Sequence, residues 1–142
     1  GGARVKLLRL AFAERENCEV DEQELHRGDA SYTIDTVRDY AVRHPDAELT
    51  CLIGADHVPL LPQWREADEL ASLAAFAAAP RPGGVRADFP APFRGRWLRG
   101  VPVDVSASDI RARAREGQPF EHLVPPTVAE AIRNLKLYAD QT

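Results

Sequence analysis

The chain has 142 residues, of which 44% are hydrophobic and 28% charged, proportions typical of a globular protein with one buried core. Its formal net charge of −4 argues against a surface that coats nucleic acid or binds an anionic membrane, but it still allows a local basic pocket for a nucleotide. No apolar run reaches membrane-spanning length and no signal-peptide pattern is present, so we expect a cytoplasmic protein.

The cysteines and histidines argue against several kinds of chemistry, and the lack of methionine bears on whether the chain is whole. Cys18 and Cys51 are each expected in a buried strand, as reduced and small apolar residues. The chain has no Cys-x-x-Cys pair and no histidine pair with zinc-ligand spacing, and its four histidines gather around no nucleophile. We therefore expect neither a zinc site nor a histidine-based hydrolase. The absence of methionine, even at position 1, leads us to expect a fragment or a trimmed chain.

Hydrophobic periodicity predicts the elements of the first part of the chain. In order, we expect a helix over residues 3–15, a strand over 18–20, a helix over 33–43 and a strand over 49–53. The apolar stripe of the first helix is expected at Val5, Leu8 and Phe12, with Leu7 and Ala11 beside them. The strand over 49–53 is apolar without interruption, which favours burial on both faces, as in a parallel sheet.

Strands and helices alternate in the second part as well. We expect a helix over 66–73, a strand over 74–79, irregular backbone over 85–96, a strand or strand pair over 97–105, and helices over 108–116 and 127–135. This alternation predicts an α/β fold of the Rossmann-like, doubly wound type, with a mainly parallel sheet in a single domain over residues 1–142.

The junction between the last strand and the next helix carries the hydroxyls of Ser106 and Ser108 and, one turn later, Arg111. A helix start has unpaired N–H groups and a partial positive charge, so it attracts phosphate. Arg111 adds a planar cation that suits phosphate oxygens. An ordinary helix start, in which Ser108 only caps the helix, explains the same residues, and both interpretations stay open.

Ligands of an open parallel sheet bind beyond the carboxyl ends of its strands. Gly54 follows one buried strand and permits close approach of the backbone, while Asp56 could accept a hydrogen bond from a ribose hydroxyl. Arg81, between two prolines after the next strand, could reach the same crevice. The alternatives are a plain turn with Asp56 as a helix cap, and a solvated loop arginine.

A second group of residues suits an aromatic anion. Tyr32 and Thr33 open a predicted helix together with Ser31, so backbone amides and hydroxyls there could receive a carboxylate. Trp64 lies in a proline-bounded loop, where its ring could stack on a heteroaromatic ligand. Helix capping by Ser31 or Thr33, and a tryptophan packed as a lid on the core, are the structural alternatives.

Six ordered segments resemble the bacterial nicotinate-nucleotide adenylyltransferase family, and together they cover nearly the whole chain. They are Ser-Tyr-Thr-Ile-Asp-Thr (31–36), Ile-Gly-Ala-Asp (53–56), Leu-Pro-Gln-Trp (61–64), Pro-Arg-Pro-Gly (80–83), Val-Ser-Ala-Ser-Asp-Ile-Arg (105–111) and Leu-Val-Pro-Pro-Thr-Val (123–128). The first segment is the most specific, because it separates this branch from other nucleotidylyltransferases, whereas the segment 105–111 is shared across the wider superfamily.

The resemblance implies transfer of AMP from ATP to nicotinate mononucleotide, giving deamido-NAD and pyrophosphate in NAD biosynthesis, helped by Mg²⁺. It also implies roles for three sets of residues. The nicotinate end would meet Tyr32, Thr33 and Trp64. The nucleotide would meet Gly54, Asp56 and Arg81. The ATP phosphates would meet Ser106, Ser108 and Arg111.

One family feature is not found in these residues. The first strand of the family ends in a Gly-Gly-Thr/Ser-Phe-Asp-Pro-x-His-x-Gly-His loop, whose histidines stabilise the reacting phosphates. We therefore expect the C-terminal portion of a nucleotidyltransferase domain, with no catalytic residue of its own and no activity alone. In the family, the two strands that we expect to be missing lie at the centre of the sheet, between the strands expected at 18–20 and 49–53.

Two other functions stay open at the level of sequence. One is the same chemistry with another acceptor, such as nicotinamide mononucleotide or a phosphopantetheine-type substrate. The other is a non-catalytic module that binds nucleotides. We expect ATP and nicotinate mononucleotide as partners, and neither nucleic acid nor membrane, while the sequence leaves a homo-oligomer open.

Overall fold

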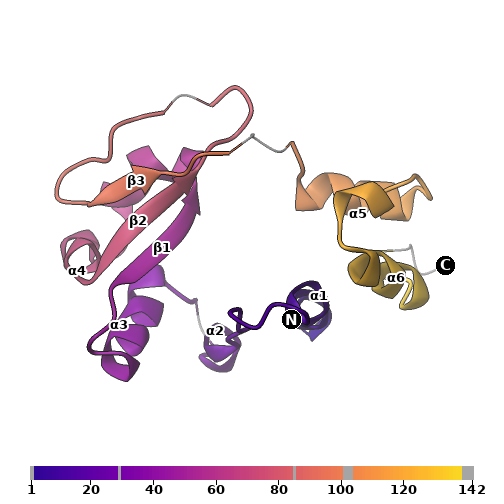
Figure 1. The fold of residues 1–142 in the computed structure, drawn as a ribbon, viewed down its shortest axis with the longest axis horizontal. Helices are drawn as coiled ribbons and strands as arrows, with labels where there is room; N and C mark the ends of the chain where they lie inside the picture. The colour runs from indigo at the N-terminus through magenta and orange to yellow at the C-terminus, as the bar shows by residue number, and fades with distance from the viewer. Residues whose placement is uncertain (1, 29, 85, 101–103, 139–142) are drawn as a thin grey trace. The chain divides into compact units, whose positions relative to one another are not determined.

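A computed structural model of the chain describes residues 2–28, 30–84, 86–100 and 104–138. Two compact units are present (Figure 1). Residues Arg27–Asp104 form one of them, called here the sheet unit, and Gly1–His26 with Val105–Thr142 form the other, called the helical unit.

Three parallel strands, β1 (Leu49–Gly54), β2 (Ala74–Ala79) and β3 (Gly95–Trp97), form the sheet in the order β1-β2-β3. Helices α3 (Thr33–Arg43) and α4 (Ala67–Leu73) contact one another, and each also contacts a strand (Figure 1). A 3-10 helix, η1 (Ala55–Gln63), follows β1 directly. The predicted α/β class and parallel pairing are thereby confirmed.

The core of the sheet unit lies between the strands and these helices. Its largest fully buried side chains are those of Ile34, Val58, Leu61, Leu70 and Phe76. The ring of Phe76, on the middle strand, packs edge-on against Phe93 with 5.5 Å between ring centroids, and against Trp64 with 6.3 Å. Such aromatic pairs contribute beyond their buried area, so Phe76 joins the strand to two flanking segments.

Burial of β1 differs from the prediction. Leu49, Cys51 and Ile53 pack against the core, but Leu52 on the opposite face is 68% exposed, so the strand is covered on one face only. The middle strand β2 is buried on both faces instead, with Phe76 on one face and Ala77 on the other. The sequence cannot distinguish these cases when both faces are apolar. Burial raises the pKa of the Cys51 thiol, which keeps it protonated as expected of a small core residue.

The third strand also differs from the prediction, which placed it over 97–105 and left 85–96 irregular. It occupies Gly95–Trp97, and pairing bonds continue on both sides, from Phe76 N to Arg94 O at 2.8 Å and from Leu98 N to Ala78 O at 2.9 Å. From the sequence, Gly95 belonged to the segment expected to be irregular. In the structure it lies within β3, where a Cβ would lie only 2.2 Å from the ring of Phe89. A glycine in a strand can mark such a close approach. Residues 101–103 of the predicted strand lie outside the described residues.

Arg38 links α3 to α4 at the surface. Its guanidinium forms ion pairs with Glu66 and Glu69, and its Nε donates to Glu69 Oε1 at 2.7 Å. Hydrogen bonds to Glu69 and Glu66 raise the pKa of Arg38, and the Arg38 hydrogen bond lowers the pKa of Glu69. The charged state of the cluster is therefore favoured over the whole neutral range.

The helical unit contains α1 (Gly2–Phe12), α2 (Gln23–His26), α5 (Ala107–Arg115), η2 (Glu121–Leu123) and α6 (Pro126–Asn134). Its core consists of Phe120, Val128, Ala129 and Ile132. The two C-terminal helices occur within a residue of their predicted bounds. Gly117 ends α5 with a positive φ of 67°, as helix-terminating glycines do.

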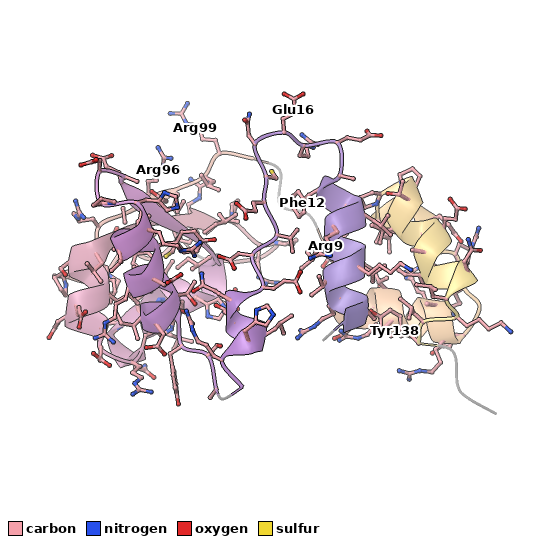
Figure 2. All side chains as sticks on the ribbon, turned by 90° about the horizontal axis from the view of Figure 1, so that it is seen from below. Arg9, Phe12, Glu16, Arg96, Arg99 and Tyr138 are labelled. Carbon is pink, nitrogen blue, oxygen red and sulfur yellow. The ribbon has the colours of Figure 1, made fainter. Side chains whose placement is uncertain are left out.

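The buried face of α1 agrees only in part with the predicted stripe. Leu7, Leu10 and Ala11 pack against the core of the helical unit, whereas Leu8 and Phe12 are 46% and 42% exposed. Figure 2 shows Arg9 and Phe12 on the side of α1 turned away from α6. Apolar residues nearly surround this helix, so spacing alone could not select the face that α6 would cover.

The strand expected over 18–20 is not formed. Cys18 is exposed, and its backbone N–H donates to Arg15 O at 3.1 Å, which closes a turn instead. None of the strands that the structure describes pairs with this segment, and without a partner three alternating residues gain nothing from extension. No helix in the described part of the chain is long and apolar enough to cross a membrane.

Replacing Phe76 should destabilise the sheet unit strongly. Phe76→Ala removes a ring that is 1% exposed and should cost about 3–5 kcal/mol of unfolding free energy. Both tryptophans of the chain, Trp64 and Trp97, lie in the sheet unit, so tryptophan fluorescence in a urea titration reports on this unit. The control Leu52→Ala, on the exposed face of β1, should change the free energy by less than about 0.5 kcal/mol. Equal effects of the two variants would contradict this account of the core.

Candidate functional site

The carboxyl ends of β1 and β2 bring Asp56 and Arg81 together, as the sequence predicted. Arg81 Nε donates to Asp56 Oδ1 at 3.0 Å, and both side chains are more than half exposed. Gly54 lies beneath this pair, and a Cβ there would lie 2.6 Å from Asp56 Oδ1 and 3.3 Å from Arg81 Nε. A Cβ at this position would push the ends of the Asp56 and Arg81 side chains aside, so glycine favours the observed position of the ion pair.

Asp56 is held in its ionised form. Its own backbone N–H hydrogen bond is the main reason that the pKa of this carboxyl lies below its usual value, and the charges of Arg81 and His57 lower it further. His57 Nε2 lies 3.7 Å from Oδ2. The alternative in which Asp56 caps a helix does not apply, since Gly54 occupies the cap position of η1. An ionised, exposed carboxylate can accept hydrogen bonds from hydroxyl groups.

A pocket of about 260 Å³ opens at the start of α3. Its lining includes the three residues that the sequence assigned to an aromatic anion, Tyr32, Thr33 and Trp64. The remaining lining residues are Ser31, Ile34, Gln63, Arg65 and Leu70. Sequence reasoning missed Gln63 and Arg65, although both flank Trp64 in the chain and their position beside it was a usable signal.

Trp64 packs on the core and also lines the pocket, while its stacking on a ligand stays a prediction. It is half-buried and packs against the core of the sheet unit, with its ring edge-on to Phe76 and to His57, 5.9 Å away. The same side chain forms part of the pocket wall. Tyr32 is the N-cap residue of α3 and makes no side-chain cap hydrogen bond, so neither Ser31 nor Thr33 takes the cap position. The helix start that faces the pocket is therefore not closed by a side chain of its N-cap residue.

The serine-rich junction, which belongs to the helical unit, starts α5 differently from the prediction. Ser106 caps the helix, since its Oγ accepts from Asp109 N at 3.0 Å. Ser108 accepts from Arg111 Nη2 at 3.1 Å instead. The alternative in which Ser108 caps the helix therefore does not apply; both serines fit the cap pattern, and only the backbone bend at Ser106 decides between them. Ser108 and Arg111 thus present a hydroxyl and a cation side by side on the first turn.

Comparison with known proteins was made by sequence and by structure. No protein-family model matches the chain. The protein of Shouchella clausii named "probable nicotinate-nucleotide adenylyltransferase" is 39% identical over 140 residues, which cover 99% of this chain and 71% of that protein.

Solved structures show the same fold. A candidate nicotinate-nucleotide adenylyltransferase of Vibrio parahaemolyticus superimposes with a TM-score of 0.73 at 20% identity, over 99% of this chain and 72% of its own. The nicotinic acid mononucleotide adenylyltransferase of Plasmodium falciparum, solved with NaAD, gives 0.60 at 19% identity, over 77% of this chain and 58% of its own.

The fold and the strand-end residues place the molecule in the class of Rossmann-like α/β proteins whose ligands bind at the carboxyl edge of a parallel sheet. The sequence identity of 39% over 99% of the chain identifies the family more specifically than the fold does. The chain belongs to the nicotinate-nucleotide adenylyltransferase family, which is a family of nucleotidyltransferases.

Removing Arg81 should raise the pKa of Asp56. In Arg81→Ala the pKa should rise but stay below the usual value, because the backbone N–H donor remains. A carbon-detected NMR titration of the Asp56 carboxyl measures this, with Arg86→Ala as a control that leaves the Asp56 pKa unchanged. Since the folded pKa is depressed, the ionised group stabilises the fold above the unfolded-state pKa, and this contribution is lost as the pH falls through the folded pKa. An Asp56 pKa that does not respond to Arg81 would show that the ion pair is not populated in solution.

Ser106 and Ser108 should differ in their effect on α5. Ser106→Ala removes the cap and should cost about 1 kcal/mol locally, which is about a fivefold faster hydrogen exchange of the Asp109 amide. Ser108→Ala removes a hydroxyl that bonds a side chain instead, and the same amide should exchange at its original rate. If Ser108→Ala accelerated the exchange of the Asp109 amide and Ser106→Ala did not, Ser108 would be the cap.

Proposed function

We propose that this chain takes part in the transfer of AMP from ATP to nicotinate mononucleotide, giving deamido-NAD and pyrophosphate in NAD biosynthesis. The observation that carries the proposal is the pocket at the start of α3, found in the same unit as the strand-end group of Gly54, Asp56 and Arg81. The names of the relatives agree with it, and so does the NaAD bound to the Plasmodium falciparum enzyme, since NaAD is the product of this reaction.

The pocket suits the pyridine ring. Its volume of about 260 Å³ is below the range of about 300–1,000 Å³ typical of sites for larger ligands, and it matches one ring with its substituent. Tyr32 and Trp64 supply aromatic surface, on which a heteroaromatic ring can stack. Thr33 begins α3, whose backbone N–H groups and partial positive charge attract a carboxylate. We assign the nicotinate end of the acceptor to these residues.

The strand-end group suits a ribose. Asp56 is ionised and exposed, so its oxygens can accept from ribose hydroxyls while Oδ1 stays bonded to Arg81. Arg81 fixes the orientation of this carboxylate and adds a positive charge that a phosphate would meet. Gly54 leaves free the space that the ends of the Asp56 and Arg81 side chains occupy, so the pair can face a ligand together.

Ser106, Ser108 and Arg111 are assigned to the ATP phosphates. Ser106 Oγ accepts from a backbone amide, which leaves its hydroxyl proton for a phosphate oxygen. Arg111 is half-buried and holds Ser108, so both groups are oriented before any ligand arrives. The positive end of α5 adds to their attraction.

The reaction needs no protein nucleophile. A phosphate oxygen of nicotinate mononucleotide attacks the α-phosphorus of ATP, the new P–O bond forms, and the bond to the β-phosphate breaks as pyrophosphate leaves. The role of this chain's residues is to align the two reactants and to neutralise the developing negative charge. The part of the chain that the structure describes has no cluster of three or more possible metal-ligating His, Cys, Asp or Glu side chains. Mg²⁺ enters the proposal as the companion of the ATP phosphates.

We further propose that residues 1–142 belong to one nucleotidyltransferase domain working in the cytoplasm, with ATP and nicotinate mononucleotide as its partners. The preference for the acid over the amide nucleotide is supported by the chemistry of the pocket, whose helix start offers donors to a carboxylate.

Ligand binding tests this proposal directly. Deamido-NAD added to the isotope-labelled chain should shift the NMR signals of Tyr32, Thr33 and Trp64, and ATP should shift those of α5. Arg111→Ala should weaken ATP about tenfold or more, by loss of a charge-assisted contact, and leave nicotinate mononucleotide unaffected. Arg115→Ala, at the other end of the same helix, is the matched control and should keep ATP affinity.

Product formation completes the test. The chain is joined at its N-terminus to a family segment with the histidine loop, and deamido-NAD is measured after addition of ATP, Mg²⁺ and nicotinate mononucleotide. Deamido-NAD and pyrophosphate in equal amounts are expected. A chain that binds no pyridine nucleotide, or an extended chain that binds both substrates and forms no product, would refute the proposed function.

A further inference from the structure

We infer that the side chain of Arg65 determines the preference of the α3 pocket for a carboxylate over a carboxamide. Of the described residues that line this pocket, Arg65 is the one that carries a full charge. The others are neutral hydroxyl, amide, aromatic and aliphatic side chains. The inference rests on the proposed function of the pocket as the site of the pyridine ring.

Arg65 is held in place by an aromatic partner. Its guanidinium carbon lies 4.6 Å from the centroid of the Tyr32 ring, within the range of a cation–π contact. Tyr32 precedes α3 and Arg65 follows Trp64, so the stack joins two walls of the pocket. An arginine that is already held against a ring loses less conformational freedom when it binds a ligand.

In this arrangement the N–H groups of Arg65 remain available to donate hydrogen bonds to a ligand. A cation–π contact occupies no hydrogen-bond acceptor, so the N–H groups of the guanidinium can still donate to the oxygens of a ligand. Glu66 Oε1 lies 3.5 Å from Nε, beyond the usual hydrogen-bond length, and Glu66 is also paired with Arg38. Among the described residues no hydrogen bond engages the two Nη groups.

Those donors discriminate between the acid and the amide. A carboxylate offers two oxygens to the planar fork and forms charge-assisted hydrogen bonds, roughly twice as strong as neutral ones. A carboxamide has one oxygen, and its NH₂ group meets only further donors, because arginine accepts no hydrogen bond. The backbone donors at the start of α3 also suit a carboxylate, and the full charge of Arg65 adds to the difference between the two forms.

Two variants and a matched control test the inference in the 142-residue chain. Dissociation constants for nicotinate mononucleotide and nicotinamide mononucleotide are measured by calorimetry. Arg65→Gln should weaken the acid nucleotide about tenfold or more and change the amide nucleotide by less than about twofold. Arg65→Lys should restore part of the preference, since it keeps the charge without the planar fork.

Arg43→Gln is the matched control. Arg43 also lies on a tyrosine, 4.3 Å from the Tyr40 ring centroid, but at the far end of α3 and among none of the residues lining the pocket. This variant should bind both nucleotides like the parent chain. Added salt should weaken the acid nucleotide more in the parent than in Arg65→Gln, because an exposed charge contact is screened.

The possible outcomes separate this inference from the proposed function. If the parent prefers the acid and Arg65→Gln keeps the same preference, the inference is wrong and the pocket assignment stands. If Arg65→Gln weakens both nucleotides equally, Arg65 only supports the pocket wall and the inference is again wrong. If neither nucleotide binds the parent or any variant, the pocket assignment itself fails, and the inference fails with it.

Discussion

The contact between Phe76 and Trp64 connects the stability of the sheet unit to its pocket. Phe76 is buried on the middle strand, and its ring meets Trp64 edge-on at the end of η1. Trp64 is thereby held with one part of its ring in the core and another in the pocket wall. A pocket wall anchored in this way keeps its shape before a ligand arrives, which lowers the conformational cost of binding. Because Trp64 is held in place, the backbone of the next residue, Arg65, is held as well, and the Arg65 side chain contacts the Tyr32 ring.

A steric constraint organises the neighbouring strand ends. Asp56 and Arg81 come from segments after two different strands, and they meet because parallel pairing aligns Gly54 with Ala79. Gly54 lies where a side chain would displace the carboxylate. The exposed ion pair contributes little to stability in water. Its importance lies in the ionised and oriented Asp56 that it presents beside the pocket residues of the same unit.

Sequence reasoning succeeded where one local signal dominated. Helix α3 has a clear apolar face at Ile34 and Val37 and a proline beyond its end, and β1 and β2 are short apolar runs bounded by turns. The site residues Tyr32, Thr33 and Trp64 were predicted as a group, and so were Gly54, Asp56 and Arg81. Their roles toward ligands stay predictions. Sequence reasoning failed where contacts or backbone geometry determine the structure. The close ring of Phe89 explains why a glycine stands in β3 at Gly95, and the extended backbone at Ser106 makes this residue the cap of α5.

The sequence by itself determined the α/β class, the family and the residue types that gather at the strand ends, because periodicity and ordered motifs are properties of the chain alone. Only the tertiary structure decided which face of α1 is buried, that Cys18 lies in a turn, that β1 is covered on one face, and that Arg65 stacks on Tyr32. Each of these depends on contact between segments distant in the chain, and the free energy of such contacts is absent from any local pattern.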